Sequence, residues 1–211
     1  MRTDTEAKEQ LIAVTGDLFA QGLLTATGGN LSVRSTDGAT LWITPAGLYK
    51  GRLSPADLVR ILPDGAVVEG NRAPSTEYRM HWAAYGARPE CRAAVHTHAP
   101  IATAFGICNQ TFPPINTDAV ALRDTVTVPW HMPGSAELAT AVGVALTRSP
   151  GCIMQNHGLM TVGETLRAAA THAMLLEETA KIVLYCQQFG APPTLLPAAD
   201  IERLASVRRF R

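Results

Sequence analysis

The apolar residues nearest the start of the chain recur at the spacing of one helical face. They are Leu11, Ile12, Val14, Leu18 and Phe19, and this pattern predicts an amphipathic helix over about residues 5–21. Similar patterns predict helices over residues 76–88, 98–106, 136–146, 164–189 and 200–208. Ser75 or Thr76 is the expected cap of the first of these and Ser135 that of the third, and Ser54-Pro55 is typical of another helix start.

Short apolar runs between these helices predict strands. The expected strands cover residues 31–34, 41–44, 92–96, 152–154 and 159–162. Asp37-Gly38 is typical of a hairpin turn and lies between the first two strands. Asp64-Gly65 marks another turn between short strands. Because helices and strands are mixed along the whole chain, we expect one α/β domain over residues 1–211. Its predicted form is a three-layer α/β/α structure with a central antiparallel or mixed sheet.

The composition allows a substantial core and argues against several classes of partner. Hydrophobic residues make up 46% of the 211 residues, and 18 basic residues balance 18 acidic ones. A neutral chain lacks the excess of positive charge that attracts nucleic acid or an anionic membrane, so neither is an expected partner. The chain begins without a signal-peptide pattern, and its four cysteines show no paired spacing. We therefore expect buried, unpaired cysteines and a reduced, cytoplasmic location.

His96-Thr97-His98 is the most informative triplet in the sequence. In extended backbone, side chains two residues apart point to the same face, so both imidazoles could reach one metal ion. His157 is the candidate third ligand, since it stands before Gly158 in a predicted turn between strands. Three histidines leave one coordination position open, as in catalytic zinc sites. The triplet alone is equally compatible with histidines that satisfy hydrogen bonds in the core.

Glu77 is the candidate acid–base group. It lies in Pro74-Ser75-Thr76-Glu77 at the expected start of a helix, where a carboxylate can simply complement the helix dipole. His81 follows four residues later on the same helix face, so these two side chains could also form a second pair of metal ligands. A complete three-histidine set leaves no need for that pair, and His81 is expected to pack or to support the site.

Three short segments are suited to holding a phosphate in a chain without a basic cluster. They are residues 28–30, residues 44–47 and residues 75–76. The first supplies flexible backbone and an amide, the second a turn with free N–H groups, and the third two hydroxyls near a helix N-terminus. Each of them, taken alone, is also an ordinary turn or cap.

Five segments together resemble the class II aldolase/adducin family. They cover residues 27–34, 43–47, 74–77, 96–98 and 156–159, in the family's order and at nearly its spacing. The resemblance implies an α/β/α fold and a homotetramer with sites at subunit interfaces. It also implies zinc (or another divalent ion such as Mn²⁺ or Co²⁺) on three histidines, proton transfer by one glutamate, and a phosphate held by the loops. The metal ligands are His96, His98 and His157; the glutamate is Glu77, which can also ligate the resting metal; the phosphate residues are Gly29, Asn30, Ala46, Gly47, Ser75 and Thr76.

The activity implied by the resemblance is cleavage or formation of a ketose 1-phosphate, with dihydroxyacetone phosphate and an aldehyde as products. The metal would stabilise an enediolate, and Glu77 would move the proton on carbon. A decarboxylase of a 3-oxo-sugar-acid phosphate passes through the same enediolate and stays an alternative, as does a dehydratase. A 4-epimerase is disfavoured because related epimerases carry aspartate at the position of Glu77. An adducin-like scaffold is disfavoured because the histidines and the glutamate are all present.

Two departures from the family pattern concern the substrate. Ala46 stands where aldolases of this family often have a hydroxyl residue. Thr117 stands at about the position of a catalytic tyrosine of these aldolases. They have another tyrosine near the C-terminus, and this chain has no tyrosine there. Asn116, Thr117 and Asp118 are the polar candidates to replace that tyrosine.

Overall fold

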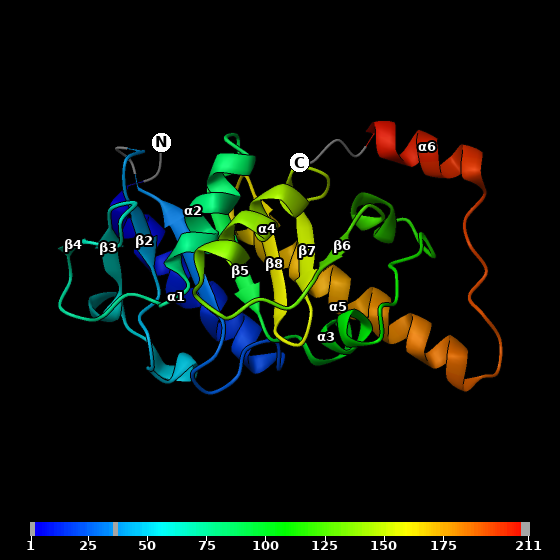
Figure 1. Ribbon diagram of the computed structural model, residues 1–211, viewed down its shortest axis with the longest axis horizontal. Coiled ribbons are helices and arrows are strands. Elements are labelled where there is room, and N and C mark those ends of the chain that lie inside the picture. Colours follow the sequence, from blue (N-terminus) through cyan, green and yellow to red (C-terminus); the bar gives the residue numbers. More distant parts are fainter. Residues whose placement is uncertain (1–2, 36–37, 208–211) are drawn as a thin grey trace.

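The computed structural model describes residues 3–35 and 38–207, which form a central sheet with helices on both faces (Figure 1). Within the described chain the sheet has eight strands in the order β4-β3-β2-β1-β5-β8-β7-β6. The strands are β1 (Asn30–Arg34), β2 (Leu41–Ile43), β3 (Val59–Ile61), β4 (Val67–Glu69), β5 (Ala93–Thr97), β6 (Val126–Val128), β7 (Gly151–Met154) and β8 (Gly158–Gly163). Neighbours are antiparallel except β6 and β7, which are parallel. The sheet is therefore mixed, and the predicted three-layer α/β fold is confirmed.

Two groups of helices make the outer layers. One face carries α2 (Tyr78–Ala87) and α4 (Ala136–Leu146), and the other carries α1 (Asp4–Ala20), α3 (Pro100–Ile107) and α5 (Leu166–Gln188) (Figure 1). Because both faces are covered, every residue of β5 is buried. The strand that contains His96 and leads directly to His98 is thus covered on both faces.

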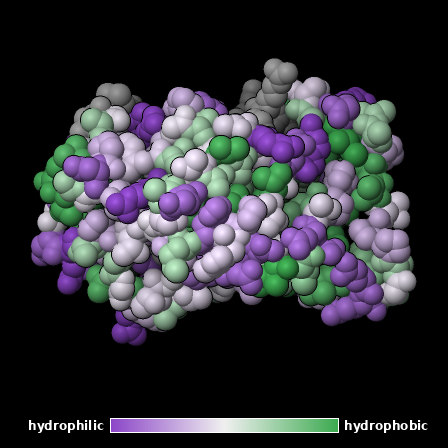
Figure 2. Space-filling view, in the orientation of Figure 1, coloured by the Kyte–Doolittle hydropathy of each residue, from purple (hydrophilic) through white to green (hydrophobic). Residues whose placement is uncertain are grey.

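The remaining helices lie at the edges of the sheet. The last helix, α6 (Ala198–Val207), is joined by an extended segment and packs near the short helix η3 (Ala119–Leu122) (Figure 1). Two further single-turn helices, η1 (Lys50–Arg52) and η2 (Pro55–Asp57), follow β2. None of the described helices is long and apolar enough to cross a membrane. Figure 2 shows apolar side chains mixed with polar ones over one face, with a group at the edge where β4 lies.

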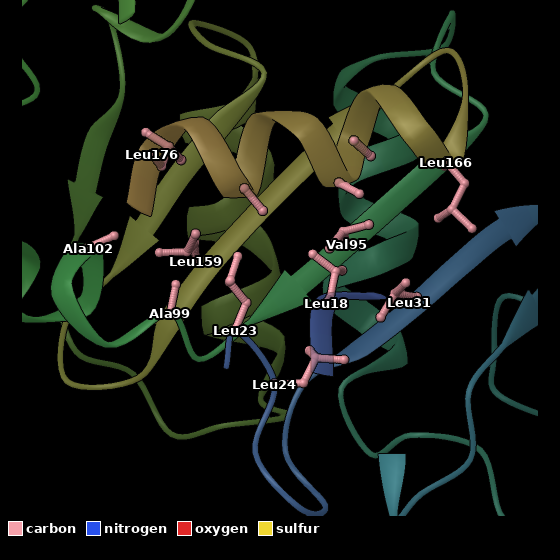
Figure 3. Packing of buried hydrophobic residues seen from close by; sticks show 14 of the residues in the cluster. Leu18, Leu23, Leu24, Leu31, Val95, Ala99, Ala102, Leu159, Leu166 and Leu176 are labelled. Carbon is pink, nitrogen blue, oxygen red and sulfur yellow. The ribbon is translucent and has the colours of Figure 1, made fainter. Parts of the chain in front are cut away.

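Each face of the sheet has its own hydrophobic core. Leu31, Val95 and Leu159 point toward α1 and α5, where they meet Leu18 and Leu176 (Figure 3). The second core lies between the sheet and the other two helices; its members include Ile43, Tyr85, Ala94, Leu138 and Met160. Adjacent residues of β5 enter different cores, as the two-residue period of a strand requires.

Some boundaries differ from the prediction. The helix expected from Ser75 or Thr76 begins at Tyr78, and Ser75 Oγ instead accepts the N–H of Glu77 within a turn. His98 precedes α3, which begins at Pro100 because proline fits the first helical turn. Ser54-Pro55 starts only a single-turn helix.

Other segments divide into confirmed and missed predictions. Ser135 caps α4 as predicted, by accepting the N–H of Leu138. Strand β6 was not expected from the sequence. The Asp37 half of the predicted hairpin turn lies outside the described residues, as does residue 208 of the predicted last helix. All four cysteines are unpaired, but Cys108 is exposed, so the expectation that every cysteine is buried is wrong.

Candidate functional site

The candidate site lies where β5 ends beside the turn between β7 and β8. His96 is in β5 and His98 is two residues further on, so both rings point to one side of the strand. His157 enters from the β7–β8 turn, which β8 brings alongside β5 through the pairing of His96 with Met160. The structure thus brings together three histidines that the sequence separates by up to 61 positions.

The reactive atoms of these side chains converge. Nε2 of His98 lies 3.1 Å from Nε2 of His96, and one ligand atom from each of the three histidines lies within 4.8 Å of the others. The Glu77 carboxylate completes the cluster. Its Oε1 lies 3.0 Å from Nε2 of His157, and its Oε2 lies 3.3 Å from Nε2 of His96.

These separations fit a divalent ion. Around a tetrahedral zinc with bonds of about 2.0–2.1 Å, neighbouring ligand atoms lie about 3.3–3.4 Å apart. The three contacts described above, between His98 and His96, Glu77 and His96, and Glu77 and His157, fall between 3.0 and 3.3 Å. Three nitrogen donors with a carboxylate are a donor set that zinc and similar divalent ions accept.

The protonation of the imidazoles also suits a metal. Nδ1 of His96 lies 2.8 Å from the carbonyl of Leu159 and can donate its proton there, which leaves Nε2 with a free lone pair toward the site. Burial, together with the charges of His96 and His157, lowers the pKa of His98 to about 4. His98 is therefore neutral at physiological pH, as a metal ligand must be.

Glu77 carries its charge inside the protein. The residue is only 8% exposed. Burial alone would raise the pKa of Glu77, but the charges and hydrogen bonds of His96 and His157 hold it well below its usual range. Although Glu77 occupies the N-cap position of α2, its side chain makes no capping hydrogen bond. The carboxylate points toward the histidines and does not cap the helix.

Two glycines leave room for this arrangement. A Cβ atom on Gly158 would lie 2.2 Å from the carbonyl oxygen of Thr97 and 3.1 Å from the His96 ring. Gly29 has φ +81°, which favours glycine, and a Cβ there would meet Leu24 and the carbonyl of His96. Larger residues at either position would push the histidine strand away.

The predicted anion-holding loops adjoin one another. Pro45 and Pro74 form an isolated β-bridge, and the N–H of Ala46 donates to the carbonyl of Ala73 at 3.0 Å. Gly47 and Thr76 are exposed on these loops. Two of the three predicted segments therefore form one surface, directly before Glu77 in the chain.

Asn30, from the first predicted segment, is placed differently. Its side chain is buried, and Nδ2 donates to Oε2 of Glu77 at 2.8 Å. Its Oδ1 faces Nε2 of His81. The structure therefore directs the Asn30 amide toward the carboxylate, while neighbouring Gly29 shapes the backbone beside His96.

Lys50 is a buried charge that the sequence did not mark as part of the site. It is 2% exposed, and its Nζ donates to the carbonyl of Pro45 at 2.9 Å. Burial lowers the pKa of Lys50 to about 8, against the opposing charge of Glu77. Only one sign in the sequence connects Lys50 with the site. Lys50 follows Gly47 by three residues, in a chain that has only three lysines.

The polar candidates for the missing tyrosine lie before η3. Asn116 Oδ1 accepts the N–H groups of Asp118 and Ala119, at 3.1 and 2.8 Å. The Asn116 side chain thus stabilises a turn.

Comparison with known proteins identifies the family. The chain belongs to the class II aldolase and adducin family, whose model, described as Class II Aldolase and Adducin N-terminal domain, matches residues 9–184. Membership, together with relatives named as aldolases, makes the protein a metal-dependent lyase.

Individual relatives refine the comparison. A 5-methylthioribulose-1-phosphate/5-deoxyribulose-1-phosphate aldolase of Rhodospirillum rubrum is 36% identical over 196 residues, 92% of this chain and 87% of that protein. A 3-oxo-tetronate 4-phosphate decarboxylase of Escherichia coli is 31% identical, and the alignment covers 97% of this chain and 98% of the decarboxylase. The solved structure of an L-fuculose 1-phosphate aldolase matches with a TM-score of 0.89 and 29% identity over 97% of each chain. The family and the fold expected from the sequence are both confirmed.

Proposed function

We propose that the protein is a zinc-dependent aldolase. It would cleave a ketose 1-phosphate into dihydroxyacetone phosphate and an aldehyde, or form the ketose 1-phosphate from these two compounds. The observation that carries this proposal is the convergence of three imidazoles and the Glu77 carboxylate, in which each group lies within 3.3 Å of at least one other. Relatives named as aldolases of ribulose 1-phosphate derivatives support the substrate class.

His96, His98 and His157 are the proposed ligands of the ion. When bound, zinc would supply a Lewis acid that stabilises the negative charge left on the carbonyl-bearing fragment as the carbon–carbon bond breaks. Glu77 is the proposed acid–base group, and it would deliver a proton to carbon in cleavage and remove it in synthesis.

The loops before Glu77 are the proposed phosphate site. Gly47 and Thr76 are exposed there, and Ser75 lies next to them. The backbone N–H groups of Gly47 and Thr76 are the proposed donors, because the Ala46 N–H, which was expected to be free, donates to the carbonyl of Ala73. Lys50 supplies a positive charge beneath the loop of residues 44–47, since its Nζ donates to the carbonyl of Pro45. A single buried cation can attract a phosphate in a chain whose formal net charge is zero.

Decarboxylation of a 3-oxo-sugar-acid phosphate is the second candidate. It is favoured by the relative named 3-oxo-tetronate 4-phosphate decarboxylase, which aligns with this chain over almost its whole length. Loss of carbon dioxide leaves the same kind of carbanion as cleavage of an aldol. The metal site and Glu77 therefore serve both reactions equally well.

Product analysis separates the two candidates. The purified protein, with its zinc content measured, would be incubated with ketose 1-phosphates and with 3-oxo-acid phosphates. The aldolase proposal expects dihydroxyacetone phosphate from the first group and no carbon dioxide from the second. Release of carbon dioxide alone would establish the decarboxylase instead.

We also propose a homotetramer with sites at subunit interfaces. Large apolar side chains are exposed on the single chain; they include Trp130, Met132, Val144 and Phe189. Light scattering on the eluted protein should give four times the mass of one 22.5 kDa chain. A monomeric mass at assay concentration would contradict the assembly.

A further inference from the structure

A buried row of polar side chains runs from the core to Glu77. Tyr85 and Ser32 are joined by a contact of 2.8 Å between their hydroxyls, and Ser32 Oγ lies 2.7 Å from Nδ1 of His81. Nε2 of His81 lies 2.5 Å from Oδ1 of Asn30, and Nδ2 of Asn30 lies 2.8 Å from Oε2 of Glu77. Each of these five residues is at most 8% exposed.

The direction of every hydrogen bond in this row follows from its last member. The Glu77 carboxylate can only accept, so the amide nitrogen of Asn30 must face it. The amide oxygen then faces His81, whose Nε2 must carry the proton. A neutral imidazole carries one proton, so Nδ1 must accept the proton of Ser32 Oγ. The Tyr85 hydroxyl also donates to the carbonyl of Ser32 at 3.0 Å, so Ser32 Oγ and that carbonyl share the one proton of the Tyr85 hydroxyl.

The charge state of His81 agrees with that reading. Burial, aided by the charge of His96 and opposed by that of Glu77, lowers the pKa of His81 to about 3. A neutral ring with one donor and one acceptor nitrogen matches its two partners. A reversed row would put the amide oxygen of Asn30 against the carboxylate oxygen of Glu77, where two acceptors meet.

We propose that His81 is a positioning residue, which holds the Asn30 amide in the one orientation that lets Nδ2 donate to Glu77. This inference rests on the proposed role of Glu77 as the acid–base group. An asparagine amide has two orientations related by a half turn, and only its partners choose between them. His81 fixes that choice together with Glu77, because its Nε2–H can donate only to the amide oxygen. The carboxylate is thereby held between His96 and His157.

Substitution of His81 tests the idea by kinetics. His81→Phe fills the space but removes the donor, and we expect the turnover number to fall about tenfold to 100-fold, since small misplacements of a reacting group cost that much. The Michaelis constant should change less than threefold, with metal content unchanged. His81→Gln retains a donor and an acceptor, so it should recover most of the lost turnover. Equal losses in both variants, or normal turnover in His81→Phe, would overturn the proposal.

His172 provides a matched control. It is another histidine whose pKa is lowered by burial, but its Nδ1 contacts the carbonyl of Val162, outside the row that ends at Glu77. His172→Phe should shift the melting temperature and leave the turnover number near that of the wild type. A comparable loss of turnover in His172→Phe would show that loss of any buried histidine has this effect.

A spectroscopic measurement keeps this proposal separate from the reaction assigned to the enzyme. In protein labelled with ¹⁵N-histidine, the His81 signals, identified by their loss in His81→Gln, should show a proton on Nε2 and a bare Nδ1. A proton on Nδ1 would overturn the proposal whatever substrate the enzyme uses. If the wild type releases no dihydroxyacetone phosphate while Nε2 is protonated, the proposed reaction fails and the orientation of Asn30 stands.

Discussion

Replacing Glu77 by glutamine removes the proposed base and changes little else. Glutamine has the same shape, and its oxygen can still accept the Nδ2–H of Asn30, a bond of 2.8 Å in the wild type. Its amide nitrogen would then face Nε2 of His157, which lies 3.0 Å from Oε1 in the wild type. The site keeps its three imidazoles, so metal content should stay near the wild-type level.

Turnover should fall steeply in this variant. A positioned general acid–base group contributes about 10²–10⁴-fold to a rate, which is about 2.7–5.4 kcal/mol in the activation free energy. If Glu77 only complemented the dipole of α2, its loss would cost about 0.3–1 kcal/mol of stability and leave turnover intact. The structure gives no capping hydrogen bond from its side chain, so we expect even that stability change to be small.

The assay compares three quantities in the same preparations. Release of dihydroxyacetone phosphate gives the turnover number, metal analysis gives occupancy, and thermal unfolding gives the melting temperature. Glu178→Gln on α5 is the control, because this carboxylate is exposed and does not belong to the cluster. If Glu77→Gln holds its metal and turns over like the control, the acid–base role is refuted.

Three further predictions concern the metal and the buried lysine. His96→Ala and His157→Ala should each lose most bound zinc in metal analysis, and full occupancy in both would exclude the three-histidine site. Gly158→Ala should lower both metal content and melting temperature, because the new Cβ would lie 2.2 Å from the carbonyl of Thr97; wild-type values would show that the turn yields. Lys50 has a pKa lowered to about 8, against about 10.4 in the unfolded chain. The unfolded chain therefore binds more protons between those values, and stability should rise with pH across that window. Lys50→Met should abolish this rise and increase the Michaelis constant for a phosphorylated substrate, as checked by denaturant unfolding at several pH values and by kinetics; an unchanged Michaelis constant would remove Lys50 from the phosphate site.

The part of the site that could be predicted from the sequence is the part set by local periodicity. His96 and His98 share a face because a strand repeats every two residues, and this needs no knowledge of the fold. The side chain of Glu77 could not be placed that way. Its direction depends on α2 beginning at Tyr78, two residues later than expected, which leaves Glu77 outside the helix and turned toward the histidines.

Contacts between distant segments were beyond reach from the sequence alone. His81 and Asn30 are 51 positions apart, and they meet only because α2 packs over β1 and β5. Nothing in the local sequence of Lys50 predicts burial of its charge, since lysine is almost always exposed. Strand β6 was missed because a three-residue strand, Val126–Val128, gives too short a pattern to recognise.

The candidate ligands come from separate segments, and this has a consequence for folding. Glu77, His96 and His157 span 80 positions and approach one another only when β5, β8 and α2 have assembled. An ion held by all of them would bind the folded chain and hardly the unfolded one. Free ion at 100 times its dissociation constant would then add about 2.7 kcal/mol to the free energy of unfolding. The supply of metal in the surroundings would thus set the fraction of chains that are folded as well as the fraction that are active.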